Sequence, residues 1–419
     1  MGSIANTPFR ILVVGGSYGG LSAALNLQDL CSNKNPRCGP KPVEGEERLD
    51  IPPQVDIDIT IIDERDGFYH LIGTPLALAD REYAAKTWVK YEDVPAVRDS
   101  SNIRVLQGSV KEVDQNLKRA KYLAAGDAEA QTVEYDYLVA AAGLRRVWPV
   151  VPQALGRKQW LLEAGNHVTE GTRGRYGVLV VGGGAVGIEM AAELKLVRPE
   201  LNVTLVHSRE KLLSSEPLPD DVKDKSLELL RDSGVEVLMG LRVQTTEEVR
   251  DEKGTFYRVT FEDGKTMLAD QVSFAISRPV AATDFLSQEV KDAEGYVKIQ
   301  PSLAFPEGSP NWADHFAAGD MVKWSGIKRC GGAMHMGYFA ANNVHQRILE
   351  ARTGKKPTFL QLDEIPPMIG LAVGKSAVSY WPQSGMSHGE DVMKLFFGDD
   401  LGFTICWNHL GLGNGKAPL

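Results

Sequence analysis

The stretch Arg10-Ile11-Leu12-Val13-Val14-Gly15-Gly16-Ser17-Tyr18-Gly19-Gly20 joins an apolar run to a glycine-rich turn. Residues 21–30 then carry leucines in a helical pattern, and a second apolar run at 58–62 ends at Asp63. A continuous apolar run is typical of a strand that is buried on both faces of a parallel sheet. The order strand, glycine turn, helix and strand therefore predicts a Rossmann-like dinucleotide-binding unit.

The same order recurs in the middle of the chain. An apolar run at 177–181 leads into Gly182-Gly183-Gly184-Ala185-Val186-Gly187, a helical pattern continues to Leu194, and the run at 203–206 ends at His207. Because two copies of one unit are more informative than either copy alone, they predict two dinucleotide-binding domains in an α/β chain.

Each glycine turn is expected to hold a pyrophosphate on free N–H groups at the start of the following helix. The second turn has glycine at all three positions of the GxGxxG pattern, whereas the first has the small Ser17 in the middle. We expect the cofactor-binding residues of the first turn to be Gly15, Gly16, Ser17, Tyr18, Gly19 and Gly20, and those of the second to be Gly182, Gly184, Ala185, Val186 and Gly187.

The residue that ends the second strand of such a unit contacts the ribose. Asp63, followed by Glu64 and Arg65, predicts an unphosphorylated adenosine in the first unit, as in FAD. The corresponding residues of the second unit are His207, Ser208 and Arg209, which suit a 2′-phosphate and so favour NADPH over NADH. A solvated turn without cofactor preference is the alternative.

The composition limits the class of protein. A chain of 419 residues suggests two to three domains, and a net charge of −9 without a long basic run argues against nucleic-acid binding. Four cysteines without paired zinc spacing predict reduced thiols and no metal site. No apolar run reaches the ~18 residues of a membrane span. The start, residues 1–7, fails the myristoylation pattern at Asn6. We expect a cytoplasmic protein, with peripheral attachment to an intracellular membrane as the weaker alternative.

Two further stretches carry a family resemblance. Tyr135-Asp136-Tyr137-Leu138-Val139-Ala140-Ala141-Ala142-Gly143 is similar to the strand that returns from the FAD domain in flavoprotein reductases with two dinucleotide domains, although Ala142 replaces the usual threonine. Phe316-Ala317-Ala318-Gly319-Asp320 is similar to the motif whose aspartate binds the ribityl chain of FAD. With the two glycine turns, the chain most resembles the apoptosis-inducing-factor-like, mitochondrion-associated reductases, which include the ferroptosis-suppressor quinone reductases, and it is similar to type II NADH dehydrogenases.

The resemblance implies roles for particular residues. The backbone of Val110 would meet the adenine, and the helix that begins near His335 and Met336 would point its N-terminus at the flavin. Glu189 would orient the nicotinamide as the catalytic residue. Disulfide reductases of this fold carry a redox cysteine pair after the first ribose-binding strand, and residues 66–75 have none. Electrons are therefore expected to leave the flavin directly for a small-molecule acceptor, and the resemblance implies a quinone.

The expected organisation is an FAD-binding domain of residues 1–150 and 291–355, an NAD(P)H-binding domain of residues 151–290, and a C-terminal α+β domain of residues 356–419. Residues 32–53 are expected to form an exposed insertion, and residues 392–397 and 403–407 to form strands around a turn at 398–400. Phe403 and Trp407 are candidate walls of the acceptor pocket, or plain core residues. A flavoenzyme specialised for one metabolite and a non-enzymatic signalling protein are the alternative functions, and the oligomeric state stays open.

Overall fold

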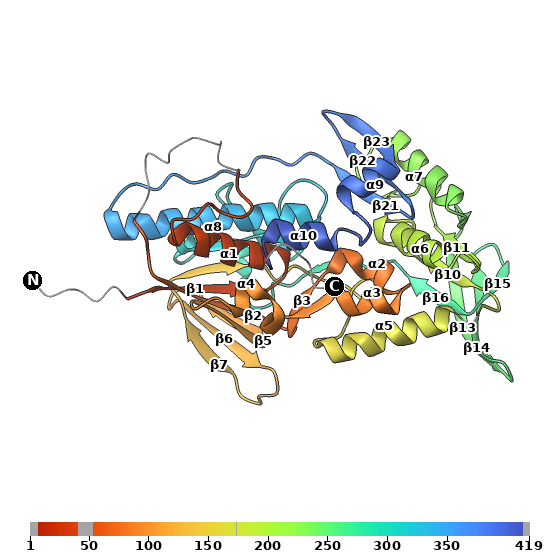
Figure 1. Ribbon diagram of the computed structural model, residues 1–419, viewed down its shortest axis with the longest axis horizontal. Helices are drawn as coiled ribbons and strands as arrows, with labels where there is room; N and C mark the ends of the chain where they lie inside the picture. Colours follow the sequence, from red (N-terminus) through yellow and green to blue (C-terminus); the bar gives the residue numbers. More distant parts are fainter. Residues whose placement is uncertain (1–6, 41–52, 173, 414–419) are drawn as a thin grey trace, which may run out of the picture.

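The computed structural model describes residues 7–40, 53–172 and 174–413, which form two sheet-centred units and a smaller C-terminal part (Figure 1). The first sheet has the strand order β19-β8-β1-β2-β5-β6-β7. Its strands are β1 (Phe9–Val14), β2 (Ile57–Asp63), β5 (Ile103–Asp114), β6 (Arg119–Ala124), β7 (Gln131–Glu134), β8 (Tyr137–Ala140) and β19 (His315–Ala317). The first five strands of that order pair in parallel, as the buried apolar runs predict.

Two long helices lie together beside this sheet. Helix α1 (Tyr18–Cys31) packs against α8 (Cys330–Thr353), although about 300 residues of sequence separate them (Figure 1). Short elements complete this unit and its edges. They are β3 (Gly67–Tyr69), α2 (Thr74–Ala77), α3 (Arg81–Lys86), β4 (Trp88–Lys90), α4 (Pro95–Arg98), β9 (Leu144–Arg145), β17 (Val280–Ala281), β18 (Val297–Lys298) and β20 (Val322–Lys323).

The second sheet is parallel, with the order β12-β11-β10-β16. It comprises β10 (Val178–Val181), β11 (Val203–Val206), β12 (Glu236–Leu238) and β16 (Gln271–Phe274), with helices α5 (Arg157–Gly171), α6 (Ala185–Val197) and α7 (Asp220–Asp232). An antiparallel sheet of β13 (Val243–Asp251), β14 (Gly254–Phe261) and β15 (Thr266–Ala269) adjoins it.

The two units repeat the same hydrogen bonds around the glycine turns. The amide of Gly15 donates to the carbonyl of Ile62 at 2.8 Å, and the amide of Gly182 donates to the carbonyl of Val206 at 2.9 Å. In both sheets the strand before the turn is central, between the ribose-binding strand and the strand that returns to the sheet. The internal duplication and the two Rossmann-like folds predicted from the sequence are confirmed.

The C-terminal part differs from the prediction. A sheet of β21 (Ile369–Val373), β22 (Ser376–Trp381) and β23 (Gly385–Gly389) is followed by two helices, α9 (Glu390–Phe396) and α10 (Phe403–Leu410). The strands expected at residues 392–397 and 403–407 are therefore wrong. Their aromatic and β-branched residues suggested strands, but Met393 and Phe397 are buried four residues apart while Leu395 is 70% exposed, which is helical periodicity.

Phe403 and Trp407 are core residues. Both are almost fully buried on α10, which lies beside α1 (Figure 1). The Trp407 ring lies 6.4 Å from that of Phe68, and Phe403 lies 5.2 Å from the ring of His70. Neither aromatic side chain lines either of the two cavities described below, so the alternative of plain core packing is favoured over the interpretation as pocket walls.

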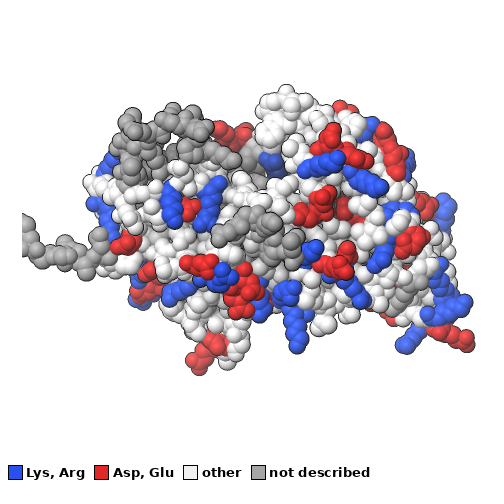
Figure 2. Space-filling view, viewed as in Figure 1, with Lys and Arg blue, Asp and Glu red and all other residues white. Residues whose placement is uncertain are grey.

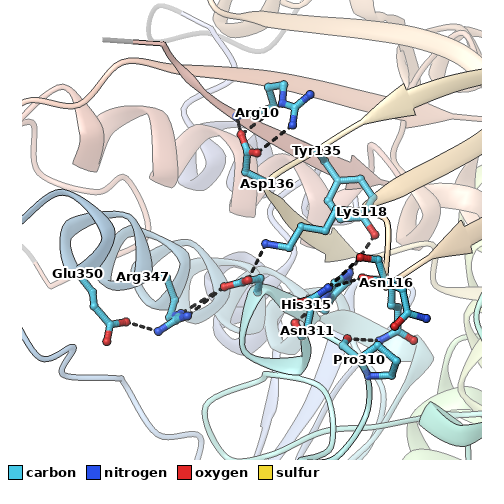
Figure 3. A network of polar contacts seen from close by, with 12 residues as sticks. Arg10, Asn116, Lys118, Tyr135, Asp136, Pro310, Asn311, His315, Arg347 and Glu350 are labelled. Carbon is cyan, nitrogen blue, oxygen red and sulfur yellow. Dashed lines mark hydrogen bonds and ion pairs between the residues drawn. The ribbon is translucent and has the colours of Figure 1, made fainter. Parts of the chain in front are cut away.

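A polar network fastens the end of the first sheet to α8 (Figure 3). Asp314 accepts hydrogen bonds from Lys118 at 2.7 Å and from Arg347 at 3.1 Å. The imidazole of His315 is fully buried between the hydroxyl of Tyr135, at 2.9 Å, and the carbonyl of Asn311, at 2.7 Å. These contacts join residues 116–136 to residues 310–350, so the late return of the chain to the first sheet is fixed by paired charges as well as by strand pairing.

Some sequence expectations concern residues outside this description. Most of the insertion, residues 41–52, and the start of the chain, residues 1–6, lie outside the described residues. Within the described ranges, no helix is long and apolar enough to cross a membrane. On the face drawn in Figure 2, basic and acidic side chains are interspersed rather than gathered into a basic stripe of the kind that nucleic-acid binding needs.

Candidate functional site

The first glycine turn has the shape of a phosphate cradle. Gly15 has a φ of +101°, and a Cβ atom there would lie 2.5 Å from the carbonyl oxygen of Ala141. A Cβ atom on Gly20 would lie 1.7 Å from the carbonyl oxygen of Gly15. Any larger residue at these two positions would therefore displace the backbone. Ser17 is the N-cap of α1, and its side chain makes no capping bond, which leaves the first amides of the helix available to an anion.

Asp63 ties the end of β2 to this turn. Its Oδ2 accepts a hydrogen bond from the amide of Gly16 at 2.6 Å, and its Oδ1 accepts one from the amide of Arg65 at 2.7 Å. Burial raises the pKa of the Asp63 carboxyl. Each carboxylate oxygen keeps a lone pair, so Asp63 can accept further hydrogen bonds from ribose hydroxyls.

A cavity of about 280 Å³ opens beside Asp63. Glu64 forms part of its wall and accepts hydrogen bonds from Arg145, at 2.8 Å, and from Ser109, at 2.9 Å. The cavity brings together these predicted FAD-binding residues: Gly15, Asp63, Glu64, Arg65, Val110 and Ala142. Gly143, the next residue along the chain, has a φ of +70°. The family resemblance predicts that Val110 and Ala142 bind FAD, and the position of Asp63 at the end of a strand predicts the same for Asp63. The structure places these three residues around one cavity.

The second glycine turn has the same internal bond with a different acceptor. Nδ1 of His207 accepts from the amide of Gly183 at 3.1 Å, and its Nε2 lies 3.1 Å from the hydroxyl of Ser214. Burial lowers the pKa of His207, so the imidazole is neutral and carries its proton on Nε2. His207 thus replaces an aspartate as the partner of the loop without adding a negative charge.

A larger cavity, of about 670 Å³, runs along this second turn. The predicted residues on its wall are Gly182, Gly184, Ala185, Val186, Glu189, His207, Ser208 and Arg209. Sequence reasoning missed the other cations that line it, namely Arg146, Arg242, Arg278 and Lys328. Arg278 could have been found, because it follows strand β16 at the carboxyl edge of the sheet, where ligands gather. A strand-end rule does not identify Arg242, because it lies between β12 and β13.

Glu189 lies on α6, on the wall of the larger cavity. Its Oε1 accepts a long hydrogen bond, 3.4 Å, from the amide of Ala372 on β21. Burial raises the pKa of Glu189 to about 8, so the side chain carries a proton at neutral pH and can donate a hydrogen bond. Glu193, one turn further along α6, is buried with one oxygen unpartnered, and burial raises its pKa to about 8 as well.

Asp320 lies in the turn directly after β19, where the carboxyl ends of the parallel strands meet. Burial raises the pKa of its carboxyl, and the cations Lys328 and Arg146 partly oppose that rise. Both cations line the larger cavity. Beneath the turn, the amide of Gly319 contacts the sulfur of Met336 at 3.4 Å, so Met336 supports this backbone from the core.

Two predicted residues take other positions. His335 is exposed on α8 with its ring against Phe339, 4.3 Å away, and it lines neither cavity. The helical turn rotates its side chain to the outer face, while Met334 and Met336 face inward. The side chain of Tyr18 is buried, and its hydroxyl lies 3.0 Å from Nδ1 of His70. Only the backbone of Tyr18 borders the glycine turn, and the side chain of Tyr18, like that of His335, lines neither cavity.

All four cysteines are free. No cysteine stands among residues 66–75, where disulfide reductases carry their redox pair, but Cys330 and Cys406 influence each other: their interaction lowers the pKa of the Cys330 thiol and raises that of Cys406. The sequence separation of 76 residues gave no hint of this interaction. No group of three side chains among the described residues is suited to hold a metal ion.

The two sites fit a pair of dinucleotides. The positive φ of Gly15 and the near-contacts that a Cβ would make at Gly15 and Gly20 make a turn that only glycine fills, and a Cβ on Gly184 would meet open space where a pyrophosphate would approach. The fold places carboxylates at the first strand end, which can accept hydrogen bonds from ribose hydroxyls, and cations at the second, which can donate hydrogen bonds to a phosphate.

Comparison with known proteins agrees with this geometry. The profile of the pyridine nucleotide-disulphide oxidoreductase family matches residues 9–337. Oxidoreductase OXR1 of Ajellomyces capsulatus is 48% identical over 100% of this chain and 91% of its own length. Ferroptosis suppressor protein 1 of Homo sapiens is 28% identical over 90% of this chain and 93% of its own length.

Two solved structures share the fold. One is an engineered water-forming NADPH oxidase bound to NADPH, with a TM-score of 0.59 and 17% identity over 88% of this chain and 75% of the other. The second is the sulfide:quinone oxidoreductase of Aquifex aeolicus, with a TM-score of 0.62 and 16% identity over 96% of this chain and 92% of the other. The chain therefore belongs to the pyridine nucleotide-disulphide oxidoreductase family and is an FAD- and NAD(P)H-dependent oxidoreductase.

Proposed function

We propose that this protein is an NADPH-dependent reductase whose electrons pass from FAD to a quinone without a redox disulfide. The observation that carries the proposal is the cavity beside the second glycine turn, which joins Arg209 and Arg242 at the β11 end to Glu189 on α6. When both groups are bound, the nicotinamide supplies a hydride and the flavin accepts it. The side chains of this chain would position the two rings, a role that depends on geometry more than on acid–base strength.

The preference for NADPH rests on charge at the end of β11. The segment after β12 returns to this strand end, because the amide of Leu241 donates to the carbonyl of His207 at 3.0 Å and the amide of Gly240 donates to that of Arg209 at 3.1 Å. Arg242 is thereby brought beside Arg209, and two guanidinium groups border the place of a 2′-phosphate. The similar NADPH oxidase was engineered from an NADH oxidase by changes that remove an aspartate and add arginine and serine, the same residue types found here.

Glu189 would bind the carboxamide of the nicotinamide. Because burial raises its pKa to about 8, the protonated carboxyl can donate to the carboxamide oxygen at neutral pH. The contact from Ala372 fixes one carboxyl oxygen and leaves the other for the cofactor. Asp320 would accept hydrogen bonds from the ribityl chain of FAD, and Asp63 would accept them from the adenosine ribose.

A quinone suits the remaining wall of the cavity. Away from the glycine turn the wall includes the apolar residues Leu71, Ile72, Pro75, Ile327 and Ile369. A flat apolar ring can bury its faces against these side chains. The name of the similar sulfide:quinone oxidoreductase gives a quinone as one of the substrates of that protein.

The purified protein and an Asp320→Ala variant test the proposal. We expect a yellow protein that oxidises NADPH rapidly when a short-chain ubiquinone analogue is added, and slowly with dioxygen, ferricyanide or disulfides alone. The variant should lose FAD on gel filtration, because the ribityl hydroxyls lose a buried acceptor. A protein that cannot be reconstituted with FAD, or one that reduces every other acceptor faster than the quinone, contradicts the proposal.

A further inference from the structure

The wall of the larger cavity is shared between the two units. Leu71, Ile72 and Pro75 belong to the segment after β3, and Ile327 and Lys328 belong to the segment before α8. Both segments are parts of the first unit, whereas the glycine turn on the same wall is part of the second. Because the reaction brings a nicotinamide ring against the flavin, we expect these side chains of the first unit to border the flavin ring.

Lys328 is a cation on this shared wall that lacks an acidic partner. Its Nζ donates a hydrogen bond to the carbonyl of Val322 at 2.5 Å and lies 5.5 Å from the centre of the Tyr296 ring. An ammonium has three N–H groups, and this carbonyl accepts from one of them. The side chain is partly buried, which lowers the pKa of the ammonium, and the carboxyl of Asp320 opposes that shift from a distance without an ion pair.

Lys323 shows the ordinary arrangement of a lysine in the same part of the chain. Its Nζ lies 5.7 Å from the centre of the same Tyr296 ring. However, 55% of its side chain is exposed, and it forms ion pairs with Glu294 at 2.7 Å and with Asp292 at 3.4 Å. A cation that is withdrawn from water without a paired carboxylate is costly. Lys328 is therefore placed to be stabilised by an anion on the cavity wall.

The other charged groups nearby do not take this role. Arg329, the next residue, contacts the sulfur of Met368 and does not line the cavity. Arg146 lines the larger cavity, but it also lines the adenosine cavity beside Asp63. Glu189 lines the same wall, and burial raises the pKa of its carboxyl to about 8, so it is protonated at neutral pH and does not neutralise Lys328.

We propose that Lys328 stabilises the negative charge of the reduced flavin and thereby raises the reduction potential of FAD in this protein. Uptake of two electrons and one proton adds one negative charge to the flavin ring, and a nearby cation stabilises that anion more than the neutral oxidised ring. The inference rests on the proposed placement of FAD along Asp63 and Asp320. It does not depend on the choice of nicotinamide or acceptor.

The reduction potential of bound FAD tests this role directly. The potential is measured by anaerobic reduction in equilibrium with a dye of known potential, in the parent, Lys328→Met and Lys328→Arg. At a fixed potential, Lys328→Met should lower the ratio of reduced to oxidised flavin at least about tenfold, which is a shift of about −30 mV for a two-electron couple. Lys328→Arg keeps the charge and should stay within about twofold of the parent ratio.

A second measurement separates this role from a structural one. The affinity for oxidised FAD, followed by flavin fluorescence, should be nearly unchanged in Lys328→Met, because the oxidised ring is neutral. Lys323→Met is the matched control, since its charge is exposed and already paired, and it should leave the potential unchanged. If Lys328→Met does not fold, Lys328→Gln, whose amide can still donate to Val322, serves in its place.

The possible failures can be told apart. A parent protein that binds no FAD contradicts the proposed function and this inference together. A parent that binds FAD at the same potential as Lys328→Met contradicts this inference alone. An equal fall in the potentials of Lys323→Met and Lys328→Met also overturns it, because the effect would then come from the net charge of the segment rather than from a cation beside the flavin.

Discussion

Replacing His207 by aspartate should reverse the proposed preference of this enzyme for NADPH over NADH. Asp63 holds the matching position in the first unit, where its Oδ2 lies 2.6 Å from the amide of Gly16, while His207 lies 3.1 Å from the amide of Gly183. An aspartate can thus keep the bond to the glycine turn. It would also add a negative charge that accepts from the 2′-hydroxyl of NADH and repels the 2′-phosphate of NADPH.

The size of the effect follows from the cations nearby. Arg209 is exposed at the edge of the cavity. Arg242 has 61% of its side chain exposed and forms an ion pair with Glu262 at 3.3 Å. A charge-assisted hydrogen bond to phosphate contributes about 1.5–3 kcal/mol, and exposure favours the lower end of that range. Arg209→Ala should therefore lower kcat/KM for NADPH by about tenfold, since ~1.4 kcal/mol is one factor of ten.

Steady-state kinetics with both cofactors checks this reasoning. The proteins are the parent, His207→Asp, Arg209→Ala and the control Arg258→Ala, whose side chain is exposed on β14 outside the cavity. We expect kcat/KM for NADH to rise in His207→Asp, to stay nearly constant in Arg209→Ala, and to be unaffected in the control. A parent that uses NADH and NADPH equally well would refute the argument, as would an Arg209→Ala variant that loses both activities to the same degree.

Three further predictions concern buried acids and thiols. Burial raises the pKa of Glu189 to about 8, so the carboxyl loses its proton as the pH rises through that value. KM for NADPH should therefore increase between about pH 7 and 9 in the parent, but it should stay constant in Glu189→Gln, because the amide donates at every pH. Parallel pH profiles of KM in the two proteins would contradict this prediction. Burial likewise raises the folded-state pKa of Glu193 to about 8. The stability that the protonated carboxyl contributes is therefore fully present below the ordinary pKa of a glutamate and is lost as the pH rises through 8. Glu193→Gln should therefore raise the free energy of unfolding most above pH 8, by up to about 5 kcal/mol. Urea titrations at pH 6 and pH 9 that show the same increase in the free energy of unfolding at both pH values would contradict this prediction. Finally, anaerobic titration should consume one NADPH per FAD; consumption of two, falling to one in Cys330→Ser, would show that Cys330 and Cys406 form a redox disulfide after all.

Local signals were enough to predict the two nucleotide-binding units. A strand, a glycine turn and a helix are contiguous in sequence, and the residue that follows the next strand must lie beside the turn, so Asp63 and His207 could be placed from the sequence alone. The return strand β8 could be placed through its family motif, and the structure confirms its place beside β1.

Features that depend on distant contacts could not be predicted. The cavity beside the second turn gathers Arg146, Arg242, Arg278 and Lys328 from four separate connections, and no local pattern brings these together. The composition of the apolar run at 392–397 is compatible with the periodicity of a strand and with that of a helix. The packing of Met393 and Phe397 against the C-terminal sheet shows that the run forms a helix. The exposed position of His335 could not be predicted for a related reason, since a sequence position near a helix start does not say which face of the helix the side chain occupies.

A comparison of the two duplicated units distinguishes the contact that stabilises a nucleotide site from the groups proposed to select its ligand. In both, an amide of the glycine turn donates to the residue at the end of the next strand, and that bond keeps the turn against the sheet whether the acceptor is a carboxylate or an imidazole nitrogen. The proposed selection depends on the kind of acceptor, a carboxyl group at Asp63 and a neutral imidazole at His207, and on the arginines that the adjacent loop brings in. A single substitution at the strand end can therefore change cofactor preference while the fold is retained, because the backbone bond on which the turn depends is conserved by either residue.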